Sequence, residues 1–166
     1  TLVGECSTII SQGATPLKSV LTAAVEAGLE VDSLQVECNS ILDNAADDIR
    51  RMAVDYFNTD DDTAVALRIA RRARTIAVSP YITERIESDI SVYTFRGKID
   101  HAMDLIGQQR WDQALTSLRE SYALAPTGDE RVRVQEFIDK VNGIVNQRTS
   151  QRNIHDSYRT RPSNEE

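Results

Sequence analysis

Apolar residues recur every three or four positions along most of this chain, and this periodicity limits the possible folds more than any other feature. The clearest run begins at position 34 and continues to position 56. Its members are Leu34, Cys38, Ile41, Ala45, Ile49, Met52 and Tyr56. Because an α-helix has about 3.6 residues per turn, these side chains share one face. They predict a long amphipathic helix that begins at Asp32 or Ser33.

The same periodicity predicts five further helices. Their approximate ranges are 15–28, 60–78, 81–107, 110–126 and 129–148. Thr15 and Asp129 are the expected caps of two of them, with Pro16 in a first turn and Gly28 as a stop. Asp60, Asp61 and Asp62 are expected to open the helix over 60–78. Gly97 lies inside another and predicts a kink or a break, since glycine costs about 1 kcal/mol there relative to alanine.

Helix-breaking residues are scarce, with 7 glycines and 4 prolines among 166 residues. No alternating apolar pattern flanked by hairpin dipeptides follows residue 14. The sequence therefore predicts an all-α fold of about six antiparallel helices with short connections. We expect one helical domain over residues 1–148 and a polar tail over residues 149–166, because that last segment is almost free of aliphatic side chains.

The formal net charge is −7. An acidic surface disfavours nucleic acid and anionic membranes as partners. The apolar runs are too short to span a bilayer, and the first residues lack the features of a signal peptide. Cys6 and Cys38 match no zinc or redox spacing, so we expect Cys38 to be a buried free thiol, with a Cys6–Cys38 disulfide as the alternative. Reduced cysteines and no export signal favour a cytoplasmic location.

Residues 110–126 read RWDQALTSLRESYALAP and carry the most distinctive pattern of the chain. Small and large residues alternate at helical spacing, and a proline ends the stretch. The series is Trp111, Ala114, Leu118, Ser121 and Pro126, with Ala102 and Leu105 on the preceding helix. The stretch resembles the second helix of a tetratricopeptide repeat, a unit of two antiparallel helices and about 34 residues. Small residues at a crossing let the two helices approach closely.

Weaker matches extend this resemblance to residues 41–148. They comprise Ala66, Ala70, Ala73 and Pro80 upstream, and Val134, Phe137, Ile138 and Val141 downstream. The spacing between Pro80 and Pro126 is longer than the period of the family, and Lys98 and His101 stand where the family has apolar residues. A non-repeat helical bundle therefore remains the alternative fold.

One basic cluster stands out in the acidic chain, over RIARRAR. Arg68, Arg71, Arg72 and Arg74 could bind an acidic peptide, a phosphate or RNA, because guanidinium groups hold carboxylates and phosphates in a bidentate manner. The alternative is that they form ion pairs with acidic neighbours within the chain, such as Asp47, Asp48, Asp55 or Glu84.

Catalytic and metal-binding patterns are absent from the sequence. The two histidines, His101 and His155, lack the spacing of zinc ligands, and Asp60–Asp62 are not spaced as a calcium loop. There is no glycine-rich phosphate loop and no nucleophile elbow. We therefore expect a non-enzymatic chain without a cofactor.

The resemblance implies an interaction module whose helical surface binds a peptide or a partner subunit, with Arg96, Asp100 and Met103 in its groove. These residues do not match the pattern with which such domains capture chaperone tails. One alternative is a structural domain of a larger protein or assembly. The other is binding of nucleic acid or phosphate through Arg68–Arg74.

Overall fold

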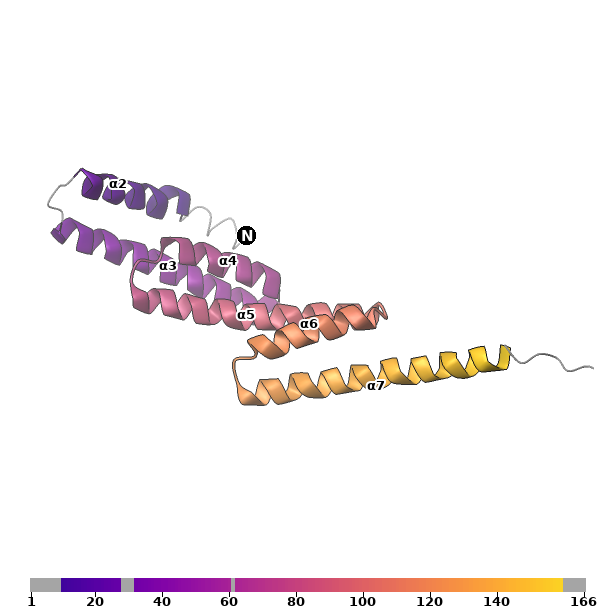
Figure 1. Ribbon diagram of the computed structural model, residues 1–166. Helices are drawn as coiled ribbons and strands as arrows, with labels where there is room; N and C mark the ends of the chain where they lie inside the picture. The colour runs from indigo at the N-terminus through magenta and orange to yellow at the C-terminus, as the bar shows by residue number, and fades with distance from the viewer. Residues whose placement is uncertain (1–9, 28–31, 61, 160–166) are drawn as a thin grey trace, which may run out of the picture. The chain divides into compact units, whose positions relative to one another are not determined.

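The computed structural model describes residues 10–27, 32–60 and 62–159. A one-turn π-helix, η1 (Ile10–Ala14), is followed by six α-helices (Figure 1). They are α2 (Thr15–Glu26), α3 (Asp32–Asp60), α4 (Thr63–Ile76), α5 (Pro80–Gly107), α6 (Trp111–Leu124) and α7 (Gly128–Arg159). No strand occurs in these ranges, so the prediction of an all-α fold is confirmed.

Some of the expectations fall on positions outside the described part. Cys6, Gly28 and Asp61 lie outside the described residues, as do the side chains of Asp32, Ser33, Leu34, Asp60 and His155. The remainder divides into two compact units, Thr1–Gly97 and Lys98–Glu166, and each is described here by itself. The division into a domain over 1–148 and a tail stays a prediction.

The first unit is built on α3 and α4, which form a hairpin, with the first part of α5 beside them (Figure 1). Its interior combines a few large aliphatic side chains with many alanines. Leu42, Ile49, Ile69 and Ile86 are fully buried, together with Ala46, Ala53, Ala66, Ala70 and Ala73. Because alanine projects little beyond the helix surface, these positions let the backbones approach closely. Cys38 is a buried free thiol, as expected.

The buried face of α3 is shifted relative to the predicted stripe, of which Ala45, Met52 and Tyr56 are only partly buried. Ile41 is 50% exposed, whereas its neighbour Leu42 is completely buried. The predicted face was centred on the large aliphatic residues. Ala46 and Ala53 were not counted in it, because alanines contribute little to such a pattern. Packing against α4 selects the face that contains these alanines, and Ile41 falls beside it.

Two of the expected helix caps are wrong. α2 is preceded directly by η1, so its N-cap residue is Ala14, whose backbone is already helical, and Thr15 is the first residue of the helix. Thr127 rather than Asp129 caps α7, because its hydroxyl group lies within reach of the helix start: its Oγ1 accepts a hydrogen bond from the Glu130 amide at 3.2 Å. Of the three aspartates expected to open α4, Asp60 is instead the last residue of α3. Asp62 caps α4 and accepts from the amides of Ala64 and Val65.

One helix is unbroken where a kink or break was expected, and another is longer than expected. α5 is continuous through Gly97, and a Cβ atom there would lie 3.4 Å from the side chain of Thr63. A Cβ atom at this position would therefore just contact the first residue of α4. α7 continues to Arg159 instead of ending near Arg148. No glycine or proline occurs between these two positions, so nothing in the local sequence terminates the helix.

In the second unit α6 and α7 form a hairpin, and the last turns of α5 belong to the same unit (Figure 1). Its buried residues are Ala102, Leu105, Ala114, Leu115, Ser117, Leu118, Ser121, Ala125, Val134, Ile138 and Val141. Ser117 donates a hydrogen bond to the Lys98 carbonyl at 2.8 Å, which joins α6 to α5. Trp111 is partly buried, and Pro126 is exposed.

Candidate interaction surfaces

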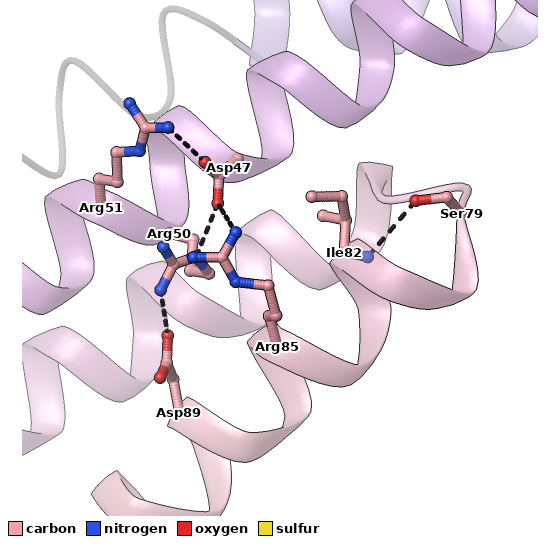
Figure 2. Close-up of polar contacts among 7 residues, drawn as sticks. All are labelled: Asp47, Arg50, Arg51, Ser79, Ile82, Arg85 and Asp89. Carbon is pink, nitrogen blue, oxygen red and sulfur yellow. Dashed lines mark hydrogen bonds and ion pairs between the residues drawn. The ribbon is translucent and has the colours of Figure 1, made fainter.

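A cluster of charged side chains joins α3 to α5 in the first unit (Figure 2). The carboxylate of Asp47 accepts from Arg50 at 2.8 Å and pairs with Arg51 at 2.7 Å, both on α3. Arg85 of α5 approaches the same carboxylate at 3.7 Å. Arg50 also donates to Asp89 of α5 at 3.0 Å. Each buried charge therefore has an opposite charge beside it.

The cluster shifts the pKa values of its members. Burial alone would raise the pKa of Asp47, but the hydrogen bonds and charges of Arg50 and Arg51 outweigh it, so the pKa lies below its usual value. The pKa of Arg50 is raised: burial opposes the charged form, and Asp47 and Asp89 more than compensate. Burial, aided by the charge of Asp89, raises the pKa of Tyr93 to about 12.

The carboxylates of α3 are thus used to hold other helices in place. One turn before Asp47, Asp43 accepts hydrogen bonds from the amides of Val78 and Ser79 at 2.8 and 3.0 Å. These amides lie at the α4–α5 turn, where no helical carbonyl group is available to them. This part of the molecule therefore has the chemistry of a structural brace, with its charges satisfied internally.

The arginines of α4 are placed differently. Arg68, Arg71 and Arg72 are exposed on the side opposite to the buried side of the helix, and we call these three residues the α4 arginine face. None of them forms an ion pair with a described residue. The expected alternative, pairing with acidic groups of the chain, does not occur for these three among the described residues, and Asp47 is occupied by Arg50, Arg51 and Arg85.

Two further basic side chains lie on or beside α4. Arg74 departs from the rest of the predicted cluster, since it pairs with Glu87 of α5 at 2.8 Å. Lys18 of α2 donates a hydrogen bond to the Thr75 carbonyl at 2.8 Å, near the end of α4. A lysine there complements the partial negative charge of the helix C-terminus and adds a basic group close to the α4 arginine face.

The groove residues implied by the resemblance lie on α5. Arg96 is exposed in the first unit, and Asp100 and Met103 are exposed in the second. Because these residues fall in different units, the structure describes each of them separately. Their role as a binding groove stays a prediction.

A groove in the second unit was not predicted. It lies between the start of α6 and the C-terminal half of α7, has a volume of about 900 Å³, and we call it the α6–α7 groove. Its lining residues are Gln109, Arg110, Trp111, Asp112, Gln113, Val145, Arg148, Thr149, Gln151 and Arg152. The sequence signal was available in the regular spacing of Val141, Val145, Arg148 and Arg152 along α7, but it becomes meaningful only when α7 continues past Arg148.

Trp111 and Arg148 contact each other in this groove. The Arg148 guanidinium lies 4.9 Å from the centre of the Trp111 ring, a cation–π contact. Arg148 also donates to the Gln109 side-chain oxygen at 3.2 Å. The indole N–H of Trp111 is buried and has no hydrogen-bond acceptor among the described residues.

No metal-binding set of three histidine, cysteine, aspartate or glutamate residues exists within the described ranges. None of the helices described is both long and apolar enough to cross a membrane. The chain matches no protein-family model, and no curated protein or solved structure is similar to it. Its function is therefore argued from its own residues.

Proposed function

We propose that this chain is a non-enzymatic interaction module that binds an acidic surface of a protein partner through the α4 arginine face. The observation that carries the proposal is the contrast between two sets of arginines. Arg50, Arg51, Arg74 and Arg85 each pair with a carboxylate, whereas Arg68, Arg71 and Arg72 are exposed without an ion pair among the described residues. In a chain with a net charge of −7, acidic groups are abundant, yet no described carboxylate forms an ion pair with this face.

The chemistry of the face suits a protein partner. Arg71 and Arg72 lie three and four positions after Arg68, so each of them is a neighbour of Arg68 on the helix surface. Guanidinium groups bind carboxylates with paired hydrogen bonds, and arginine is enriched where protein interfaces derive most of their energy. α4 is packed on its opposite side by fully buried alanines, so the arginines project from a rigid helix. Such a helix loses little conformational entropy on binding.

Helical hairpins resembling tetratricopeptide repeats are the architecture that we propose for this module. The α3–α4 and α6–α7 hairpins support it, together with the buried small residues Ala70 and Ala114. Stacked hairpins commonly present extended surfaces to partners. The buried free thiol of Cys38 is compatible with a reducing compartment, and we propose a cytoplasmic location.

The test is an affinity capture with the wild-type chain and the double variant Arg71→Glu plus Arg72→Glu, with the bound proteins identified by mass spectrometry. We expect the variant to lose the partners of the wild type, because its charge on this face is reversed. Arg131→Glu plus Arg133→Glu is the matched control, since both residues are exposed on α7. Circular dichroism verifies that each variant remains helical. Retention of the same partners by the α4 variant would contradict the proposal.

Nucleic acid is the competing ligand for an arginine face. Binding of an oligonucleotide that weakens steeply with salt, and that the α4 double variant abolishes, would replace the protein partner in the proposal. We expect no such binding, because the acidic remainder of the chain repels a polyanion.

A structural role within an assembly is the second candidate. Large apolar side chains are exposed in the first unit, with Val20, Val36 and Tyr81 each more than 60% accessible. If neighbouring subunits cover these residues, the isolated chain should aggregate or form oligomers. A cooperative, monodisperse monomer in light scattering would favour the self-contained module.

A further inference from the structure

The buried face of α7 changes its chemistry along the helix. Val134, Ile138 and Val141 are buried in the second unit, and they follow each other at intervals of four and three residues. The same spacing leads through Val145 to Arg148 and Arg152, which line the α6–α7 groove. The face is therefore apolar alongside α6 and becomes basic near the start of α6. α7 is also much the longer helix of this hairpin, so its last turns extend beyond its partner.

The groove at this transition is rich in hydrogen-bond donors. Three guanidinium groups line it, from Arg110, Arg148 and Arg152, against the single carboxylate of Asp112. Arg148 is oriented by the Trp111 ring and by the Gln109 side chain. A guanidinium group held in this way needs less reorganisation when it binds a carboxylate.

We propose that the α6–α7 groove binds a short acidic segment of the partner protein, with Arg148 and Arg152 pairing with its aspartate or glutamate side chains. This inference rests on the proposed function, since it assigns a second contact to the same kind of partner. The two arginines are four positions apart on one face of α7, so they meet carboxylates spaced along an extended chain. A volume of about 900 Å³ suits a few residues of peptide. A long polyanion is disfavoured, because the chain as a whole is acidic.

The groove contains its own reporter, because Trp111 is the single tryptophan of the chain. The experiment is a fluorescence titration of the full chain with a capped hexaglutamate peptide, which contributes no aromatic signal. We expect a saturable change in Trp111 emission with this peptide and none with capped hexaglutamine. Inorganic phosphate and a short single-stranded oligonucleotide are titrated in parallel.

Variants locate the binding within the groove. Arg152 is exposed and no ion pair holds it to another described residue, so Arg152→Gln should leave the fold intact and weaken hexaglutamate binding about tenfold. Arg131→Gln is the matched control, because it removes an exposed arginine of α7 outside the groove. An unchanged affinity in Arg152→Gln, or an equal response to hexaglutamine, would overturn the inference. Tighter binding of the oligonucleotide than of the peptide would also overturn it.

The outcomes separate this inference from the proposed function. Arg71→Glu plus Arg72→Glu should retain hexaglutamate binding, because these residues do not line the groove. If the peptide fails to bind while partner capture still depends on Arg71 and Arg72, the groove inference alone is wrong. If the peptide binds in an Arg152-dependent manner while the α4 variant still captures every partner, the α4 proposal alone is wrong.

Discussion

The two units of this protein differ in the chemistry that packs their helices together. In the first unit the seam between α3 and α5 contains charge, with Asp47 only 8% exposed and Arg50 and Asp89 beside it. In the second unit the buried polar residues among those described are two serines. Ser117 and Ser121 donate to backbone carbonyl groups, and the ion pair of Lys98 with Glu120 lies at the surface.

This difference decides which change each unit tolerates. A buried ion cluster is satisfied only when all of its members are present, and removal of one leaves its partners unpaired in a poor solvent for charge. An interior of small and apolar side chains has no such dependence, but it is sensitive to volume because close-packed helices cannot move apart without loss of contact. Both units have buried alanines and should be sensitive to added bulk, but only the first should also be sensitive to lost charge.

The largest effect is expected from Asp47→Ala. The change leaves Arg50 and Arg51 without their shared carboxylate, and we expect the free energy of unfolding to fall by about 2–4 kcal/mol. Urea unfolding followed by circular dichroism measures it. Asp48→Ala is the control, because Asp48 is the exposed neighbour. In the second unit, Lys98→Ala should cost less than about 1 kcal/mol, as exposed pairs do. Equal losses in Asp47→Ala and Lys98→Ala would remove the proposed difference between the units.

Lowering the pH should remove the stabilising contribution of the Asp47 carboxylate in the wild-type chain. The pKa of Asp47 is lower in the folded state than in the unfolded state, so the stabilisation is present above the unfolded value of 3.8 and is lost as the pH falls through the folded value. In Asp47→Asn, the free energy of unfolding should not show this part of the decrease at low pH. A variant whose stability changes with pH as the wild type does, from pH 5 to pH 2, would contradict this assignment.

The next effect concerns added volume. Ala114 of α6 is completely buried. Ala114→Leu should overpack the interior of the second unit and destabilise the protein by about 1–3 kcal/mol. Thermal unfolding measures the change, and Ala123→Leu on the exposed side of α6 is the matched control. A neutral outcome for Ala114→Leu would mean that the second unit has room at this position, and it would weaken the resemblance to a tight helical hairpin.

Helix positions were largely predictable from the sequence, because period and breakers are local properties. The buried series of α6 follows from the spacing of Ala114, Leu118 and Ser121. The exact face of α3 did not follow, since Leu42 and Ile41 are equally apolar and packing against another helix decides between them. The partners of the arginines were predictable only in part. Asp47 stands three residues before Arg50, so their ion pair is local, whereas Arg68 stands at the same distance before Arg71. The second partner of Arg50, Asp89, is 39 positions away, and only the fold brings it near.

Alkaline titration should affect the first unit through Tyr93. Its pKa is about 12 in the folded state and 10 in the unfolded state, so the fold favours the neutral phenol. This stability is complete below pH 10 and is lost as the pH rises towards 12, by roughly 1–2 kcal/mol. Urea unfolding between pH 9 and pH 11.5 measures the slope. Tyr93→Phe should flatten it, and Tyr122→Phe, at an exposed position of the second unit, should not. Equal slopes in Tyr93→Phe and wild type would show that the buried phenol is not responsible.

The smallest predicted effect concerns a turn, because the turns of the two units are stabilised in different ways. The α4–α5 turn is held by a side chain, since Asp43 accepts its amide hydrogens, and its residue Ala77 has an ordinary extended backbone. The α5–α6 turn is held by backbone hydrogen bonds, with the Arg110 amide donating to the Leu105 carbonyl at 2.9 Å. This pattern requires Gln109 to adopt a positive φ of 60°, a conformation that favours glycine.

Gln109→Gly should therefore stabilise the protein by about 0.5–1 kcal/mol, because relief of the left-handed conformation exceeds the greater chain entropy of glycine in the unfolded state. The lost hydrogen bond from Arg148 is exposed and opposes this gain only slightly. Gln109→Ala removes the same bond and retains the strain, so it should be neutral or slightly destabilising. Urea unfolding of both variants separates the two contributions. If Gln109→Gly destabilises as much as Gln109→Ala, the contact with Arg148 matters more than the backbone, and the turn of the second unit is held by a side chain as the first one is.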